Sequence, residues 1–353
     1  MTGQHAIPDE LPGPVGPLWG APPAPERSAQ PSPGPVRGRA TVARPVATRT
    51  ALDPGKDARW SIGDPGRAFA EVVPVLGDPA EGPDTIADVG TVGSVHLVAA
   101  SVRGLSHQQN GTPRQDSYGF AYTADKAWLV VVVADGVSAG PLSHRAAQLV
   151  ARHAPGRVIA EFAEVGDVGA IDWYKIFEDL AKRVLRIGQK LLIEKGAAEA
   201  AVEDVPDAMA TTATIAVVEI SPPGDERRVA YAWLGDSPIW RVDNEGVWQC
   251  LTEVKNAGQD VPKSSVNALP RLPSEPVKLP HDCRSIPADA MLLLMTDGVG
   301  DPLGAADGEV AARLAEVWRR PPNMFRFAEQ VAFGRKSFDD DRTVVAVWPR
   351  TEP

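Results

Sequence analysis

Two stretches of this sequence share one pattern, a continuous apolar run that ends in Asp-Gly. Leu129–Gly136 reads LVVVVADG, and Met291–Gly298 reads MLLLMTDG. An apolar run of this length is typical of a strand that is buried on both faces of a sheet. The Asp after each run would then be held at the rim of a core. The Gly would let the chain turn sharply and would leave a backbone carbonyl accessible.

Other acidic residues are candidates to join Asp135 and Asp297 at one site. Gln115-Asp116 comes just before an expected strand, and Asp339-Asp340-Asp341 comes just before the last one. Clustered carboxylates repel one another unless a cation lies between them. Hard divalent ions prefer oxygen ligands, so the pattern predicts a site for a pair of such ions.

Composition narrows the class of protein. The chain has 353 residues, a formal net charge of -10 and only two cysteines, Cys250 and Cys283. The negative charge argues against nonspecific nucleic-acid binding and against an anionic membrane surface. Two cysteines exclude a disulfide framework and a four-cysteine zinc site, which fits a reducing compartment. The sequence has no secretory signal and no apolar run of bilayer length, so we expect a cytoplasmic protein without membrane insertion.

The first part of the chain, residues 1–92, differs from the rest. Its first half is dense in proline, which favours a largely disordered or polyproline-like segment. A plain linker and a docking peptide for a partner are both open interpretations of this tail. Trp60–Leu76 is less polar, and we expect it to dock on the folded body as an extended strap. The folded domain is expected at residues 93–349.

The order of the expected elements predicts an α+β fold. We expect strands at residues 95–102, 118–122, 128–134, 212–220, 229–234, 238–242, 247–251, 291–296 and 343–348. We expect helices at 142–163, broken or kinked near Pro155, and at 173–194, 309–318 and 324–333. A turn is expected at Asn244-Glu245-Gly246, and a loop at residues 255–288. Because βαβ alternation is missing, the order favours two packed sheets with helices outside.

Six short motifs follow one another along the expected domain. They are Gln115-Asp116-Ser117, Val133-Ala134-Asp135-Gly136-Val137, Ala210-Thr211-Thr212-Ala213, Leu234-Gly235-Asp236-Ser237, Thr296-Asp297-Gly298-Val299-Gly300-Asp301 and Asp340-Asp341-Arg342-Thr343. In this order and spacing they resemble the metal-dependent protein serine/threonine phosphatases, the PPM or type 2C family, especially its bacterial members. The resemblance implies a four-layer αββα sandwich, in which two antiparallel β-sheets are flanked by helix pairs.

The resemblance also implies an assignment of metal ligands. Asp135 would bridge two Mn²⁺ or Mg²⁺ ions, one of which the Gly136 carbonyl joins, and Asp297 and Asp340 would complete the ligands of the other ion. Asp301 and Asp236 match acidic positions linked to a third, weaker ion, although Asp236 is also suited to accept backbone hydrogen bonds in a Gly-Asp-Ser turn.

Asp116 would orient a metal-bound water from outside the first shell of ligands. The catalytic set is therefore Asp135, Asp297, Asp340 and Asp116. Two ions so held can activate a water for attack on a phosphoserine or phosphothreonine and neutralise the incoming phosphate. Phosphorylated proteins are accordingly the implied substrates, and no cysteine nucleophile is needed.

Three positions depart from the family pattern. Gln115 stands where many members have Glu, and a neutral amide oxygen binds a hard cation more weakly than a carboxylate does. The register of the phosphate-binding arginine is altered, which leaves Arg103 and Arg114 as candidates and a solvated loop charge as the alternative for Arg114. Val137 follows Asp-Gly where eukaryotic members have His. In those members this His is the acid that protonates the leaving group. His107 is a candidate for this acid, and the alternatives are that His107 caps a turn or that a metal-bound water donates the proton.

Two other functions are consistent with the same residues. One is a catalytically weak or inactive scaffold that keeps the sandwich and binds a partner through the Pro-rich tail and the rim of the metal site. Retention of Asp135, Asp297 and Asp340 argues against it, because buried carboxylates without a role are costly. The other is a phosphatase of the same fold that acts on an anti-sigma-factor antagonist, which the sequence does not distinguish from the first reading.

Overall fold

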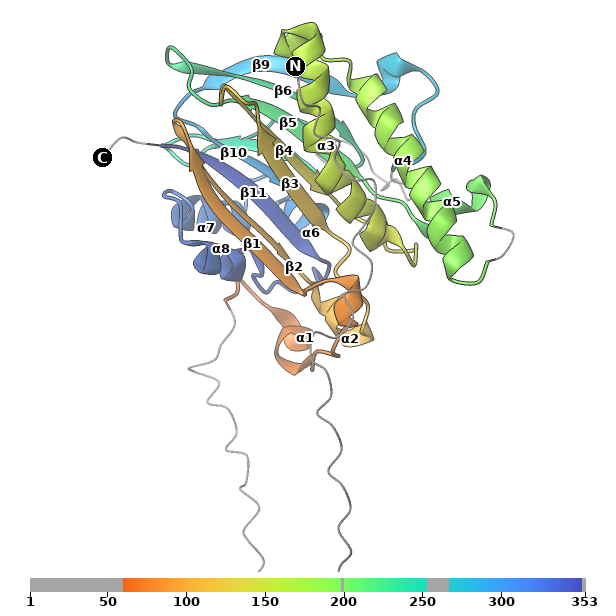
Figure 1. Cartoon of the computed structure of the whole chain (residues 1–353). Coiled ribbons are helices and arrows are strands. Elements are labelled where there is room, and N and C mark those ends of the chain that lie inside the picture. The colour runs from red at the N-terminus through yellow and green to blue at the C-terminus, as the bar shows by residue number, and fades with distance from the viewer. Residues whose placement is uncertain (1–59, 198–199, 253–266, 351–353) are drawn as a thin grey trace, which may run out of the picture. The chain divides into compact units, whose positions relative to one another are not determined.

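Two antiparallel sheets form the centre of the molecule. The computed structural model describes residues 60–197, 200–252 and 267–350. The strands of the six-stranded sheet, in spatial order, are β1 (Thr85–Val92), β2 (Val95–Val102), β11 (Arg342–Pro349), β10 (Met291–Met295), β7 (Ile239–Val242) and β8 (Trp248–Cys250). Those of the five-stranded sheet are β3 (Ser117–Tyr122), β4 (Trp128–Ala134), β5 (Ala213–Glu219), β6 (Glu226–Leu234) and β9 (His281–Pro287). Every pairing is antiparallel, as the sequence predicts (Figure 1).

The two apolar runs occupy the middle of the sandwich, and both are buried on each face. Along β4, Leu129, Val131 and Val133 belong to the core between the sheets, while Val130, Val132 and Ala134 belong to the core under a helical layer. Strand β10 alternates in the same way between the inner core and the opposite helical layer. Continuous apolar runs are required here because neither face of either strand meets water.

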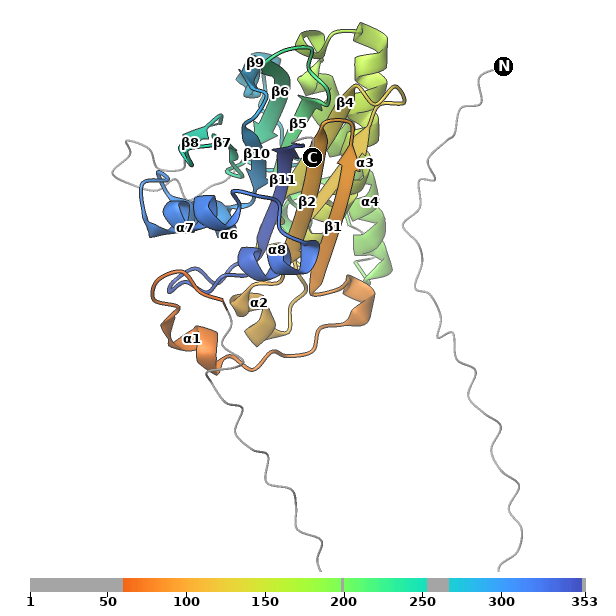
Figure 2. The same cartoon turned by 90° about the vertical axis from the view of Figure 1, so that its left-hand side faces the viewer.

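Helices cover the outer face of each sheet, which completes the four layers (Figure 2). The five-stranded sheet packs against α3 (Ser143–Val165) and α4 (Trp173–Glu194), and the six-stranded sheet against α6 (Asp297–Leu303), α7 (Glu309–Val317) and α8 (Met324–Val331). Asp172 caps α4 as expected, since its side chain accepts from the Lys175 N–H at 3.0 Å. Helix α3 is not broken at Pro155, because Ala154, Pro155 and Val158 are all buried in the core.

The ordered body begins before residue 93, where the sequence analysis places the start of the domain. Strand β1 pairs with β2 along its whole length, from Thr85 opposite Val102 to Val92 opposite Val95. It has no apolar run, because Asp88–Thr91 are exposed at the edge of the sheet. Upstream of it, Ile62 is buried, and the Ile62 N–H donates to the Gly334 carbonyl at 3.1 Å. The expected strap therefore docks, although it contains a short helix, α1 (Gly66–Glu71).

The expected loop at 255–288 contains the edge strand β9. Most β9 side chains are exposed, so the sequence lacks the apolar alternation by which a strand is recognised. The part of that loop at residues 255–266 lies outside the described residues, as does the prediction of disorder for residues 1–59. The turn expected between β7 and β8 is present, with the Gly246 N–H donating to the Asp243 carbonyl at 3.0 Å.

Several short elements complete the fold. Two are α-helices, α2 (Leu105–Asn110) and α5 (Val205–Ala208), and four are 3₁₀ turns at Pro79–Glu81, Val168–Ala170, Val202–Asp204 and Pro276–Lys278. Among the described helices, none combines the length and the apolar character that crossing a bilayer requires.

Candidate metal centre

Four strand termini bring the predicted aspartates to one end of the sandwich. Asp116 directly precedes β3 and Asp135 directly follows β4, and in this antiparallel pair Ser117 lies opposite Ala134. Asp340 lies two residues before β11 and Asp297 two residues after β10, and in that pair Met295 lies opposite Val344. The start of one strand and the end of its antiparallel partner share an edge. Each sheet therefore places two carboxylates at this end of the sandwich.

The charges of these carboxylates act on one another. Burial raises the pKa of Asp135 well above its ordinary value, and the charges of Asp116, Asp297, Asp340 and Asp236 raise it further. Burial, followed by the charges of Asp297 and Asp341, raises the pKa of Asp340 to about 6. Carboxylates from both sheets thus lie within electrostatic reach of each other. Such a group is stable in its ionised form only with cations between its members.

Asp116 is fixed by two threonines that the sequence analysis did not single out as ligand-positioning residues. Its Oδ2 accepts hydrogen bonds from Thr296 Oγ1 at 2.7 Å and from Thr343 Oγ1 at 2.8 Å. Thr296 comes just before Asp297, and Thr343 pairs with Ser101 at 2.6 Å. One oxygen of Asp116 therefore ties the ends of β10 and β11 together across the two sheets.

The backbone of Asp135 is clamped by the Ala210–Ala213 motif. Its carbonyl accepts from the Thr212 N–H at 2.7 Å and from Thr211 Oγ1 at 2.8 Å, and its N–H donates to Thr212 Oγ1 at 3.1 Å. Thr212 Oγ1 also lies 3.2 Å from Ser237 Oγ, which connects the Gly235-Asp236-Ser237 turn to the same cluster. These hydrogen bonds connect the Ala210–Ala213 and Leu234–Ser237 motifs to Asp135.

The glycines after Asp135 and Asp297 are needed for close packing. A Cβ on Gly298 would lie 1.9 Å from the Asp341 carbonyl oxygen, and a Cβ on Gly136 would lie 2.9 Å from that of Gln115. Gly298 lies inside α6, so the sharp turn expected there is the first turn of a helix. Both positions exclude a side chain because another ligand-bearing segment passes directly beside them.

Gln115 offers an oxygen to the site. Its N–H donates to Asp341 Oδ2, while its side-chain Oε1 is buried and has no hydrogen-bond partner among the described residues. A buried amide oxygen left without a donor is unfavourable unless another group, such as a cation, satisfies it. Together with the aspartates, this oxygen fits a divalent ion.

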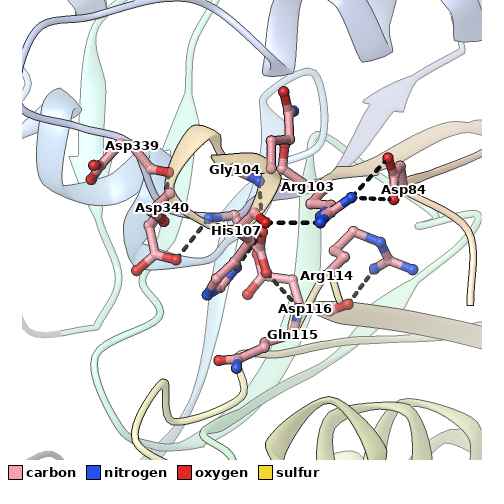
Figure 3. Close-up of polar contacts among 12 residues, drawn as sticks. Asp84, Arg103, Gly104, His107, Arg114, Gln115, Asp116, Asp339 and Asp340 are labelled. Carbon is pink, nitrogen blue, oxygen red and sulfur yellow. Dashed lines mark hydrogen bonds and ion pairs between the residues drawn. The ribbon is translucent and has the colours of Figure 1, made fainter. Parts of the chain in front are cut away.

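Asp341, to which the sequence analysis gave no individual role, pairs with His107, its candidate for the acid, and Figure 3 shows His107 next to Asp340. Asp341 Oδ1 accepts from the Gly104 N–H at 2.6 Å and forms an ion pair with His107 Nδ1 at 2.9 Å. Burial lowers the pKa of His107, but the hydrogen bond and charge of Asp341, together with the charges of Asp340 and Asp116, raise it above its ordinary value. Ligand atoms of His107, Asp340 and Asp341 lie within 4.8 Å of one another. Backbone N–H groups donate to both carboxylate oxygens of Asp341, whereas the Asp341 N–H donates to Oδ1 of Asp340, so Asp340 is better placed to bind an ion.

The two arginines considered for phosphate binding are both buried. Arg103 donates to Asp84 Oδ1 at 3.0 Å, to the Val75 carbonyl at 3.2 Å and to the His107 carbonyl at 2.8 Å. Arg114 donates to Ser101 Oγ at 2.6 Å and to the Asp116 carbonyl. Arg114 is therefore not a solvated loop charge, which was the alternative interpretation for it, and Arg103 is not solvated either. In this state, their described partners are all groups of the protein.

The two residues considered for a third ion lie at the margin of the cluster. Asp236 is half-buried and contributes to the raised pKa of Asp135. Asp301 is exposed on α6, one helical turn after Asp297. The geometry thus keeps both near the ligand-bearing segments.

The chain is similar to known proteins in its sequence family and in its fold. A family model described as protein phosphatase 2C matches residues 103–330. Similar solved structures include the S. agalactiae serine/threonine phosphatase, at 18% identity and a TM-score of 0.47, covering 72% of this chain and 99% of that one. Serine/threonine phosphatase Stp1 from Staphylococcus aureus is 14% identical, with a TM-score of 0.49 and coverage of 75% and 98%. RsbX in complex with magnesium is 13% identical, with a TM-score of 0.38 and coverage of 75% and 100%. No curated protein sequence matches the chain.

Proposed function

Because the chain belongs to the protein phosphatase 2C family, we propose that it is a metal-dependent phosphatase of phosphoserine and phosphothreonine in proteins. The observation that carries the proposal is the meeting of Asp116, Asp135, Asp297 and Asp340 at one end of the sandwich, where the charges of the other three raise the pKa of Asp135 and the charge of Asp297 raises the pKa of Asp340. Four strand termini that present carboxylates to one point have no evident structural use, since the repulsion between them destabilises the fold.

We assign each residue of the cluster a task toward two Mn²⁺ or Mg²⁺ ions. Asp135, directly after β4, would hold both ions, and the Gly136 carbonyl would join one of them, while Asp297 and Asp340 would hold the other from the six-stranded sheet. Gln115 Oε1 adds a neutral oxygen, and Asp301 and Asp236 are candidates for a third, weaker ion. When bound, such ions supply Lewis acidity and lower the pKa of water.

The protein groups around the ions orient the reactants. Asp116 keeps one oxygen for Thr296 and Thr343, which leaves the other to position a water. Asp341 holds the His107 ring and the Gln115 backbone in place. Because the terminal Nη1 and Nη2 groups of Arg103 and the Nη1 group of Arg114 already donate to groups of the protein, we assign neither arginine to direct phosphate contact in the described state.

Turnover in the presence of metal tests this proposal directly. The full chain is incubated with Mn²⁺ and a phosphothreonine peptide, and the released phosphate is measured with and without EDTA. We expect EDTA-sensitive release in the wild type, and loss of at least about 100-fold of it in Asp135→Asn, because a metal-ligating carboxylate is removed. Asp225→Asn is the matched control, since Asp225 is exposed and lies next to the start of β6, whereas the other end of β6 leads to Asp236. Metal-independent release, or unchanged release by Asp135→Asn, would refute the assignment.

A non-catalytic scaffold is the second candidate. Gln115 in place of a carboxylate and the engaged arginines favour it. A scaffold has no need for two ions, so calorimetric titration with Mn²⁺ separates the two functions. The proposals of a cytoplasmic location, of bacterial phosphorylated proteins as substrates and of a partner for the Pro-rich tail depend on the sequence alone.

A further inference from the structure

Residues 60–84 extend the strap expected at Trp60–Leu76 and are called the strap from here on. They run past the metal end of the molecule and are fixed at both ends. Figure 2 shows their course from α1 beneath α2 to the start of β1. At the first end, the backbone of Trp60–Asp64 pairs with residues 334–336: the Gly334 N–H donates to the Trp60 carbonyl at 2.9 Å, and the Lys336 N–H to the Asp64 carbonyl at 2.8 Å. This end is buried at Ile62 and is firmly packed.

The second end of the strap is held by charges. Glu81 lies 2.7 Å from His144 Nε2, 2.7 Å from Arg145 and 3.9 Å from Lys195. Burial would raise the pKa of Glu81, but the His144 hydrogen bond and the cations lower it below its ordinary value. This end therefore docks on the start of α3 and the end of α4 through the Glu81 carboxylate, and the Ala80 and Glu81 carbonyls also accept hydrogen bonds from Arg145 and Gln148 of α3.

Between these ends the strap is weakly packed. The side chains of Val73 and Leu76 are 81% and 90% exposed. The Val75 N–H donates to the Gln108 carbonyl at 2.8 Å, which is its backbone link to α2. A segment with exposed apolar side chains and few packing contacts opens locally at low free energy.

The strap holds the guanidinium of Arg103. Two of its three described acceptors, the Asp84 carboxylate and the Val75 carbonyl, belong to the strap. Figure 3 shows the guanidinium turned toward Asp84 and away from Asp340. Arg103 Nε is buried and has no hydrogen-bond partner among the described residues. The backbone of Arg103 is nevertheless close to the metal end, because the next residue, Gly104, donates to Asp341.

A cavity borders Arg103. This cavity of about 150 Å³ is lined by Arg103 and Asp340 together with Phe69 of the strap. A guanidinium released from Asp84 thus has room beside a proposed metal ligand. Since Asp84 is 56% exposed, its side chain is free to turn into solvent when the contact breaks.

We propose that the strap is an autoinhibitory clamp on Arg103. In the described state it keeps the guanidinium turned away from the metal end, and release of Val75–Asp84 lets Arg103 bind the phosphate of a substrate. Arginine suits this task because its fork of donors matches phosphate oxygens. The inference rests on the proposed phosphatase function and adds a form of regulation to it.

Weakening the clamp in the full chain tests the proposal. The double variant Glu81→Gln, Asp84→Asn removes both strap charges and keeps the shapes of the side chains. Its matched control is Glu71→Gln, another strap carboxylate, which pairs with Arg67 inside the strap. We expect KM for a phosphothreonine peptide to fall about tenfold in the double variant and to stay unchanged in the control, since apparent affinity follows the fraction of competent molecules. Misfolding would not lower KM, so a lower KM reports release of the clamp. An unchanged or higher KM overturns the proposal.

A reversible crosslink gives the opposite perturbation. A Cβ built on Gly111 would lie 3.6 Å from the Val75 Cβ, within the range of a disulfide. In the variant Val75→Cys, Gly111→Cys we expect the oxidised protein to have a higher KM than the same protein after reduction. The wild type, treated in parallel, controls for Cys250 and Cys283. Equal KM values before and after reduction overturn the proposal.

Binding of inorganic phosphate separates this proposal from the proposed function. Calorimetry with phosphate and Mn²⁺ needs no turnover. If the wild type is inactive but the double variant binds phosphate more tightly than the wild type, the clamp stands and the phosphatase function fails. If the wild type is active and the two proteins bind phosphate equally, the clamp fails and the phosphatase function stands.

Discussion

Asp135 occupies a position where burial and four neighbouring carboxylates all oppose its negative charge. The fold nevertheless clamps its backbone with three hydrogen bonds from Thr211 and Thr212. Rigid placement of a charge that the surroundings disfavour is typical of residues kept for a ligand. The proposed cations would turn this repulsion into attraction.

Changing Gln115 to Glu tests whether its side-chain oxygen faces an ion. Because a carboxylate binds a hard cation more strongly than an amide, we expect Mn²⁺ to bind at least about tenfold more tightly in Gln115→Glu by calorimetry. In EDTA the same variant should melt at a lower temperature than the wild type, since one more carboxylate joins the cluster. Unchanged Mn²⁺ affinity would mean that Oε1 points away from the ion.

The sequence alone does not predict the different roles of the three residues in the acidic run Asp339-Asp340-Asp341. The resemblance selected Asp340, which is half-buried beside Asp297. The structure gives its neighbours different tasks: Asp339 is exposed, while Asp341 is buried and holds Gly104, His107 and Gln115. Spacing does not reveal this division, because it depends on which backbone N–H groups face each carboxylate. The sequence likewise does not reveal which buried groups accept the hydrogen bonds of Arg103 and Arg114.

The strands differ in how readily their sequences predict them. β4 and β10 were predicted from the sequence because burial on two faces requires a continuous apolar run. The edge strands β1 and β9 were missed because most of their side chains are exposed. Helix α6 was read as a turn, since its first residues are Asp297-Gly298 and Gly is typical of turns.

The layer of α3 and α4 contains a buried acidic residue, Glu161, whose contribution to the free energy of unfolding can be measured. Glu161 of α3 is 2% exposed and pairs with Arg157 at 3.0 Å and with Lys175 of α4 at 2.8 Å. Burial would raise the pKa of Glu161, but hydrogen bonds from Lys175 and Arg157 lower it below its ordinary value of 4.5. A lowered pKa in the folded state stabilises the protein above the unfolded pKa, and this contribution disappears as pH falls through the folded pKa.

We therefore expect Glu161→Gln to lower the free energy of unfolding by about 1 kcal/mol at neutral pH, a value kept small because Lys175 is partly exposed. The difference from wild type should shrink toward zero by about pH 3. Urea denaturation at several pH values measures it. Glu178→Gln, which removes the exposed pair with Lys182 on α4, is the control and should change stability by less than about 0.5 kcal/mol. A difference that persists undiminished in acid would show that the pair is not the cause.

At the scale of the whole molecule, the four layers and the metal end depend on each other. Three cores hold the sheets and helices together, and the carboxylates lie where strands of both sheets end. An ion that binds this end of the folded chain stabilises the whole fold, by about 2.7 kcal/mol for each site at 100 times its Kd. The sequence predicted these layers from the order of its elements and also the docking of Trp60–Leu76, whereas strand β1 and the contacts of residues 77–84 required the structure.

The most direct test of the central claim is a calorimetric titration of Mn²⁺ into the EDTA-treated full chain, with Asp135→Asn and Asp225→Asn measured beside it. The account predicts two bound ions for the wild type and for Asp225→Asn, and loss of tight binding of both ions in Asp135→Asn, because Asp135 lies among all the other carboxylates. Equal binding by the wild type and Asp135→Asn, or no binding by the wild type, would contradict it.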